Sequence, residues 1–258
     1  MTQVRVAAVG DVHVGTDGAG RLRPHFEHVA ERADVLLLAG DLTRRGEPEE
    51  VRVLADELRD FPVPIVAVLG NHDHHADEAE TVVSALEDAG VRVLEGGTAV
   101  VDVDGARLGV AGVKGFGGGF AGASGSEFGE REMKAFMAHT REVAGSLEDA
   151  LRTLDTDVRV ALLHYAAVEA TLRGERLEIY PFLGSYLLAE AVDRAGADLV
   201  VHGHAHNGTE RGVTPGGVPV RNVAQPVLRR SYAVYCFGPD RLGRCDGGDE
   251  ASMAAASR

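Results

Sequence analysis

Long apolar runs along this chain end abruptly in polar side chains, and the clearest case is the stretch 63–73. Its apolar, largely β-branched residues stop at Gly70 and are followed at once by Asn71, His72 and Asp73. A continuous apolar run of this length is typical of a strand buried on both faces, as in a parallel sheet. Because open α/β sheets bind ligands at the carboxyl ends of such strands, we expect a functional site there.

Four other segments show the same transition from an apolar strand to a polar end. The run 4–9 leads into Gly10, Asp11, Val12 and His13; 35–39 into Gly40 and Asp41; 158–163 into His164; and 199–201 into His202, Gly203, His204, Ala205 and His206. The carboxyl ends of neighbouring parallel strands lie at one edge of a sheet. Aspartate, asparagine and histidine side chains are therefore predicted to meet at that edge.

Amphipathic helices are predicted between the strands of the first part of the chain, at 24–33, 47–59 and 78–89. Apolar residues in these segments recur every three or four positions, as on one face of a helix. A further short strand is expected at 91–94. This alternation predicts a parallel sheet with right-handed crossover connections.

The second part of the chain is expected to add antiparallel elements. A hairpin is predicted at 98–111, where two apolar segments flank Asp104 and Gly105. Helices follow at 127–154, with a bend at Gly145, and at 186–195. Strands at 218–223 and 231–237 are interpreted as closing antiparallel strands. The glycine-rich segment from Gly115 to Gly125 is either a mobile flap beside the site or an ordinary surface loop.

Length and composition favour one α/β domain over residues 1–238, with 239–258 as a disordered C-terminal tail. The predicted polar residues extend from Asp11 to His206, so a cut between them would divide the site. No apolar run has the length of a signal peptide or of a membrane span, and we expect a cytoplasmic protein. Cys236 and Cys245 are interpreted as free thiols in preference to a disulfide.

The formal net charge of -14 argues against nucleic acid as a partner, because binding a polyanion requires a basic surface. No membrane partner is expected either. A small phosphorylated molecule remains compatible with the charge, since metal ions can neutralise one phosphate locally. The oligomeric state stays open.

Taken together, Asp-x-His, Gly-Asp, Gly-Asn-His-Asp, the strand-end histidine and Gly-His-x-His form an ordered set that resembles the calcineurin-like metallophosphoesterase superfamily. The resemblance covers residues 4 to about 223. It implies a layered α/β sandwich in which central, mostly parallel sheets with added antiparallel strands are flanked by helices. It also implies hydrolysis of a phosphoester by in-line attack of a metal-bound hydroxide at a two-metal site.

The resemblance assigns two overlapping sets of metal ligands in this sequence. The first set is Asp11, His13, Asp41 and His206; the second is Asp41, Asn71, His164 and His204. Oxygen and imidazole ligands without thiolate suit manganese, iron or zinc. Two such ions about 3.5–4 Å apart can stabilise both oxygens of an in-line displacement.

Other histidines and one aspartate near these motifs receive different interpretations. By the resemblance, His72 stabilises the phosphate in the transition state or protonates the leaving oxygen. Asp73 is expected to orient a neighbouring histidine in preference to binding metal. His202 lies outside the Gly-His-x-His spacing and is not assigned as a ligand. The remaining histidines are expected to be surface or helix residues: His25, His28, His74, His75 and His139.

The segment 40–48 followed by Gly-Asn-His-Asp looks like the small bacterial branch of the superfamily that includes cyclic-nucleotide phosphodiesterases. We therefore expect hydrolysis of a small phosphodiester or phosphomonoester. Two alternatives remain. One is a metal-dependent nuclease, which the charge disfavours, and the other is a non-catalytic scaffold on the same fold, which the complete ligand set disfavours.

Overall fold

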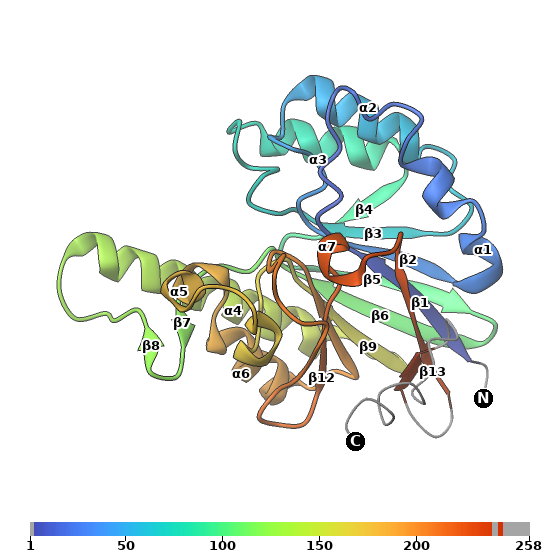
Figure 1. Ribbon diagram of the computed structural model, residues 1–258. Coiled ribbons are helices and arrows are strands. Elements are labelled where there is room, and N and C mark those ends of the chain that lie inside the picture. The colour runs from blue at the N-terminus through green and yellow to red at the C-terminus, as the bar shows by residue number, and fades with distance from the viewer. Residues whose placement is uncertain (1–2, 239–241, 245–258) are drawn as a thin grey trace, which may run out of the picture.

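The computed structural model describes residues 3–238 and 242–244, and it contains two six-stranded sheets packed face to face (Figure 1). Helices cover the outer face of each sheet. This is the layered α/β sandwich predicted from the sequence, with mostly parallel sheets and added antiparallel strands.

The first sheet has the strand order β14-β13-β1-β2-β3-β4. Its strands are β1 (Val4–Val9), β2 (Val35–Ala39), β3 (Ile65–Val68), β4 (Val91–Val93), β13 (Ala233–Phe237) and β14 (Leu242–Arg244). Strands β1 to β4 are parallel, whereas β13 is antiparallel to both β1 and β14. The connecting helices are α1 (Val29–Arg32), α2 (Pro48–Leu58) and α3 (Ala79–Asp88). The parallel strands all end at one edge, which therefore receives their polar ends.

The second sheet has the order β11-β12-β10-β9-β6-β5. Its strands are β5 (Gly97–Val103), β6 (Ala106–Gly112), β9 (Val158–Leu162), β10 (Leu199–His202), β11 (Arg211–Val213) and β12 (Pro219–Asn222). β5 and β6 form the expected hairpin, and both turn residues, Asp104 and Gly105, have positive φ. β6, β9, β10 and β12 are parallel, so a second set of strand ends points in one direction.

Alternating side chains of the second sheet build two separate parts of the core. Val160 and Leu162 of β9 join the cluster that lies between the two sheets. Ala161 points the other way, into a cluster that includes Leu147 of α4 (Arg131–Thr153) and Val192 of α6 (Tyr186–Ala195). Both faces of the sheet are therefore buried, which explains why its strands are continuously apolar in sequence.

Several predicted elements have different bounds or partners in the structure. The predicted helix at 24–33 is replaced by a 3-10 turn, η1 (Arg23–Phe26), and by the single turn of α1. Strand β12 is antiparallel to β11, as expected, but it runs parallel to its other neighbour β10, because the β11–β12 hairpin reverses the chain before β12 joins the sheet. The short Arg211–Val213 strand contains a glycine and carries no clear alternation. The helix α4 runs through Gly145.

The connections around the second sheet contain further short elements. In the glycine-rich segment, β7 (Gly119–Phe120) and β8 (Ala123–Ser124) form a small hairpin. The connection from β9 to α6 contains η2 (Glu169–Leu172), η3 (Leu177–Ile179) and α5 (Tyr180–Leu183), and α7 (Gln225–Leu228) precedes β13. Residues 117–120 are buried, so this part of the glycine-rich segment is packed against the protein.

The expectation of free thiols is wrong, because Cys236 is in a disulfide. The only other cysteine, Cys245, lies outside the described residues. Within the predicted C-terminal tail, Leu242–Arg244 form β14, and the rest of that tail falls outside the described part of the chain. Among the helices of the described residues, none has the length and apolar character needed to cross a membrane.

Candidate metal centre

The strand ends of both sheets meet at one place and bring the predicted site residues together. From the first sheet, Asp11 and His13 follow β1, Asp41 follows β2, and Asn71 and His72 follow β3. From the second sheet, His164 follows β9, and His204 and His206 follow β10. Residues separated by most of the chain therefore converge because the sheets place their carboxyl ends at a common edge.

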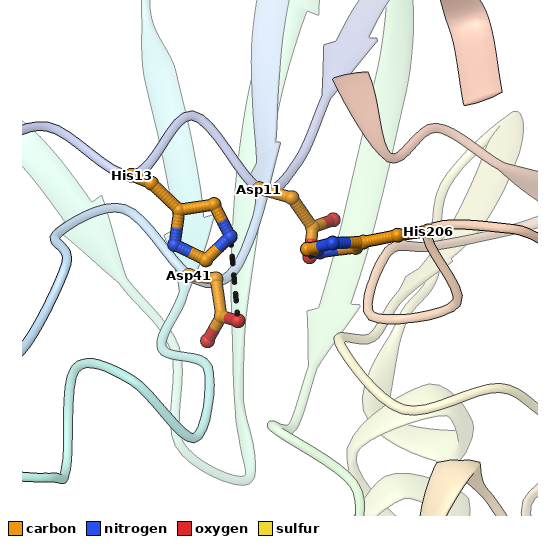
Figure 2. A group of neighbouring side chains, drawn as sticks. All are labelled: Asp11, His13, Asp41 and His206. Atoms are coloured by element: carbon orange, nitrogen blue, oxygen red, sulfur yellow. Dashed lines mark hydrogen bonds and ion pairs between the residues drawn. The ribbon is translucent and has the colours of Figure 1, made fainter. Parts of the chain in front are cut away.

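The first group of neighbouring side chains consists of Asp11, His13, Asp41 and His206 (Figure 2). One ligand atom from each lies within 4.8 Å of the others. His206 Nε2 is 2.8 Å from Asp11 Oδ1, and His13 Nε2 is 3.9 Å from Asp41 Oδ2. Two carboxylates and two imidazoles thus face a common point.

A second group shares Asp41 with the first and adds His164 and His204, again with ligand atoms within 4.8 Å of one another. His164 Nε2 is 3.3 Å from Asp41 Oδ1 and 3.0 Å from Asn71 Oδ1. The amide of Asn71 therefore faces the same point as the second group. Asp41 faces both groups with its two oxygens.

Burial controls the charges at this centre. Asp11 and Asp41 are only 2% and 1% exposed. Loss of solvation raises the pKa of Asp11 to about 6, against the opposing effect of its hydrogen bond with His206. The same loss of solvation lowers the pKa values of His164 and His204 to about 3, so both imidazoles are neutral near pH 7. The hydrogen bond with Asp11 raises the pKa of His206.

This donor set fits a bound cation. Neutral imidazoles offer lone pairs, and two buried carboxylates require compensating positive charge. His206 is the one histidine of the two groups whose pKa is raised, so the imidazoles supply little of that charge. The residues present would therefore suit transition-metal ions bound by oxygen and nitrogen.

Backbone carbonyls orient the histidine rings toward the centre. The Nδ1 of His164 is 2.9 Å from the Ala39 carbonyl, which leaves Nε2 facing Asp41. His204 is oriented through its other nitrogen, because Nε2 lies 3.2 Å from the Phe182 carbonyl. In each case a ring N–H donating to a carbonyl leaves the second nitrogen as a lone pair.

His72 lies at the rim of the centre, with 45% of its side chain exposed. Its Nδ1 is 2.7 Å from the Arg44 carbonyl, and its Nε2 is 3.8 Å from Asp41 Oδ2. Its backbone N–H also donates to Asp41 Oδ1 at 2.9 Å. The ring therefore faces the shared carboxylate and remains open to solvent.

Asp73 is buried, and it orients backbone where a histidine partner was expected. Its carboxylate accepts hydrogen bonds from the backbone N–H groups of Leu42, Thr43 and Gly70, and from the Thr43 hydroxyl. These bonds join the loops that follow β2 and β3. Asp73 thus fixes the positions of Asp41 and Asn71 through the backbone, and the expectation that it orients a histidine is wrong.

Several of these side chains are carried on left-handed backbone. Asp11, His13, Asp41 and His204 have φ values of 59°, 45°, 50° and 67°. Glycines beside them allow close packing: a Cβ at Gly70 would collide with the Asp41 carboxylate, and one at Gly203 with that of Asp11. The glycines in the sequence motifs therefore leave room for the buried carboxylates of Asp11 and Asp41.

The other histidines divide into buried and exposed groups. His202, which was not assigned as a ligand, is fully buried between the Gly203 carbonyl (2.8 Å) and the Thr171 hydroxyl (2.9 Å). It supports the loop that carries His204. His25, His28, His75 and His139 are exposed, whereas His74 has a buried Nε2 that was not anticipated.

Sequence reasoning did not anticipate Lys114 as a neighbour of the centre. The Lys114 carbonyl accepts the N–H groups of His164 and Tyr165, each at 3.0 Å. The Tyr165 ring lies 4.3 Å from the His204 ring. Lys114 follows the apolar strand β6 just as the metal-type residues follow theirs, and that position was the available signal.

Comparisons with known proteins agree with this geometry. Residues 4–208 match the family model described as calcineurin-like phosphoesterase. A search of curated protein sequences found no match.

Solved structures with a similar fold include proteins of different kinds. Phosphopantetheinyl hydrolase (PptH) from Mycobacterium tuberculosis has a TM-score of 0.65 and 18% identity, over 95% of this chain and 96% of that one. A putative 5'-nucleotidase from Staphylococcus aureus has a TM-score of 0.60 and 15% identity, over 95% and 53%. GAP50, the anchor in the inner membrane complex of Plasmodium, has a TM-score of 0.59 and 12% identity, over 95% of this chain and 84% of that one.

At these identities the structural matches show a shared fold. The family model covers most of the chain, including every residue of the two groups of ligand atoms. This chain belongs to the calcineurin-like phosphoesterase family.

Proposed function

We propose that this protein is a metal-dependent phosphoesterase that hydrolyses a small phosphodiester or phosphomonoester with two transition-metal ions. The observation that carries the proposal is that Asp41 contributes to both groups of ligand atoms. One shared carboxylate holds two cations close together. Ions about 3.5–4 Å apart can stabilise both the attacking and the leaving oxygen of an in-line displacement.

The two sites overlap at Asp41. The first consists of Asp11, His13, Asp41 and His206, and the second of Asp41, Asn71, His164 and His204. Manganese, iron and zinc all suit these ligands. When bound, the ions would neutralise the phosphate and make water more acidic. The chain itself supplies the rigid loops that hold the ligands in place, through Asp73 and the ring contacts with Ala39 and Phe182.

His72 acts on the phosphate without binding a metal. Donation from Nδ1 to the Arg44 carbonyl leaves Nε2 directed at the centre. In the imidazolium form, Nε2–H donates either to a phosphate oxygen or to the leaving oxygen. The neutral ring in this tautomer has only a lone pair at Nε2, so the role of His72 requires protonation.

A small substrate is favoured over nucleic acid. The net charge of -14 opposes a polyanion, and one phosphate can be neutralised locally by the two ions. The largely buried Tyr165 ring lies beside His204, where its exposed edge could contact a base or similar ring. These features support a diester such as a cyclic nucleotide, as in the branch that the motif pattern resembles.

The test is a panel of phosphomonoesters, cyclic and linear diesters and nucleoside polyphosphates, assayed with manganese. We expect diester hydrolysis, with about two metal ions bound per chain by elemental analysis. Absence of bound metal would favour a scaffold, a role compatible with the fold because the similar GAP50 is described as an anchor.

A salt series separates the small-molecule enzyme from a nuclease. Hydrolysis of a small diester is expected to change little between low and high salt, because screening is weak at the close range of the metal ions. Cleavage of single-stranded DNA would depend steeply on salt. Preferred cleavage of DNA with a steep loss at high salt would reverse this proposal in favour of the nuclease.

A further inference from the structure

A pocket of about 420 Å³ lies beside the metal centre, between the end of β6 and helix α4. Its polar lining consists of His74, Glu95, Lys114, His139, Glu142 and Ser146. None of these residues belongs to the two groups of ligand atoms. The pocket is therefore a separate chemical environment next to the candidate metal centre.

Lys114 is an unusual residue in this chain, which has 26 lysines and arginines but only two lysines, Lys114 and Lys134. Its carbonyl accepts the N–H groups of His164 and Tyr165, so its backbone is fixed next to a residue of the second metal group. Its ammonium lies 5.6 Å from the Phe116 ring and 5.9 Å from the Tyr165 ring. Both distances are within the range of a cation–π interaction, so the rings help to hold the ammonium at the wall of the pocket.

The Lys114 ammonium forms no ion pair with a carboxylate in the described part of the chain. Among residues 3–238 and 242–244, the structure shows no ion pair to it, although the side chain is half-buried. Glu95 and Asp41 act on Lys114 through space, and neither forms an ion pair with it among the described residues. Glu142 lies beside His139, at 3.9 Å. A desolvated cation without a partner is costly, and an incoming anion would remove that cost.

A second polar group in the same pocket also lacks a partner. The Nε2 of His74 is buried and, within the described part of the chain, forms no hydrogen bond. It lines the pocket together with Lys114. This nitrogen is closed to solvent in the structure, so the Lys114 ammonium is the group that an anion in the pocket would contact.

We propose that Lys114 binds a second anionic group of the substrate, a carboxylate or a phosphate, while the scissile phosphate lies at the metal centre. This inference rests on the proposed phosphoesterase function and adds a substrate class, namely phosphoesters with two anionic groups. The acidic residues Glu95 and Glu142 in the lining limit the preference to one additional group. Lys114 is thus a specificity-determining residue.

Binding of two matched ligands tests the proposal directly. Phenylphosphonate and 3-carboxyphenylphosphonate differ by one carboxylate, and neither can be hydrolysed at a phosphoester bond. Titration calorimetry on the manganese-loaded protein should show about tenfold tighter binding of the carboxylated ligand, as expected for one charge-assisted contact. In Lys114→Met, which keeps an apolar stem against the rings, the preference should fall to within about twofold.

Lys134→Met is the matched control, because it removes the other lysine, from an exposed position on α4. It should keep the full preference. Thermal melts establish that both variants are folded, and Lys114→Arg, which restores the charge, should recover part of the preference. Equal loss of affinity for both ligands in Lys114→Met, or an unchanged preference, would show that Lys114 has only a structural role.

Hydrolysis of p-nitrophenyl phenyl phosphate and of its 3-carboxyphenyl analogue separates this inference from the proposed function. Hydrolysis of both diesters at equal kcat/KM, with equal binding of the phosphonates, would overturn the role of Lys114 and leave the phosphoesterase intact. Preferential phosphonate binding without any hydrolysis would overturn the proposed function and leave the anion site. A wild-type protein that binds neither phosphonate would refute the anion site.

Discussion

The two sheets contribute to the centre in different ways. The first sheet supplies both carboxylates, and its loops are hydrogen-bonded to each other: the N–H groups of Asp11 and His13 donate to the carbonyls of Gly40 and Asp41. The second sheet supplies the neutral histidines His164 and His204, together with His206, whose pKa is raised by Asp11, from strands joined by long connections that also carry Lys114 and Tyr165. The comparison indicates that the first sheet sets the charge and geometry of the centre, and that the second shapes what binds beside it.

The largest expected effect comes from Asp41→Asn, because Asp41 belongs to both groups of ligand atoms and so links the contributions of the two sheets. We expect loss of metal from both sites and a fall in turnover of about a thousandfold or more, because a shared ligand charge disappears. Elemental analysis and kinetics measure both. His13→Ala and His204→Ala, as controls, should each lower mainly one metal equivalent. Full occupancy and normal hydrolysis in Asp41→Asn would contradict the shared site.

His72→Ala tests whether the first sheet, through the residue that follows β3, also supplies the proton for the leaving oxygen. Metal content should stay near that of the wild type, and turnover should fall by about a hundredfold, as for a lost general acid. The loss should be smaller for substrates with very good leaving groups, because these need little protonation. An equal loss for good and poor leaving groups would leave only electrostatic stabilisation by His72.

Most of the fold and the position of the centre could be predicted because buried parallel strands are continuously apolar and end in chemical residues. The β11–β12 hairpin was missed because Arg211–Val213 has no clear pattern. The role of Asp73 could not be predicted, since its partners are backbone groups brought close only by the fold. Lys114 was overlooked because a single lysine after a strand carries no motif.

Asp73→Asn tests the hydrogen bonds by which Asp73 joins the loops that follow β2 and β3 of the first sheet. The amide can accept at one oxygen only, so an N–H donor among Leu42, Thr43 and Gly70 loses its acceptor. We expect the free energy of unfolding of the metal-free protein to fall by about 2 kcal/mol, measured with urea. The exposed Asp17, which pairs with Arg44, is the control, and Asp17→Asn should leave the unfolding midpoint unchanged. Equal stability of Asp73→Asn and Asp17→Asn would show that the hydrogen bonds of Asp73 do not stabilise the fold.

The smallest expected effect is a pH dependence of stability that originates mainly in histidines of the second sheet. The pKa values of the buried imidazoles of His164, His204 and His202 are lowered to about 3, 3 and 4, so acidification protonates them in the unfolded chain only. Their contribution to stability is present above pH 6.5 and is lost as the pH falls. Asp11 and Asp73, with pKa values raised to about 6, bind protons in the folded state and act in the opposite direction.

Three histidines against two carboxylates leave about one extra proton on the unfolded chain between pH 6.5 and 5. The free energy of unfolding of the metal-free protein should therefore decrease by about 1 kcal/mol per pH unit on acidification. Urea unfolding at pH 7, 6 and 5 with a chelator measures it. Stability that stays constant or rises toward pH 5 would show that the carboxylates of the first sheet, Asp11 and Asp73, dominate the pH dependence.

The left-handed backbone at Asp11, His13, Asp41 and His204 also has a consequence for laboratory evolution of this protein. Glycine adopts that conformation without strain, so replacing His13, whose side chain accepts no backbone N–H of the described residues, with glycine relieves about 1 kcal/mol of strain while removing a side chain of the centre. A selection for heat resistance alone would therefore reward variants with an empty, inactive centre. Screens for stabilised forms must score metal retention together with melting temperature.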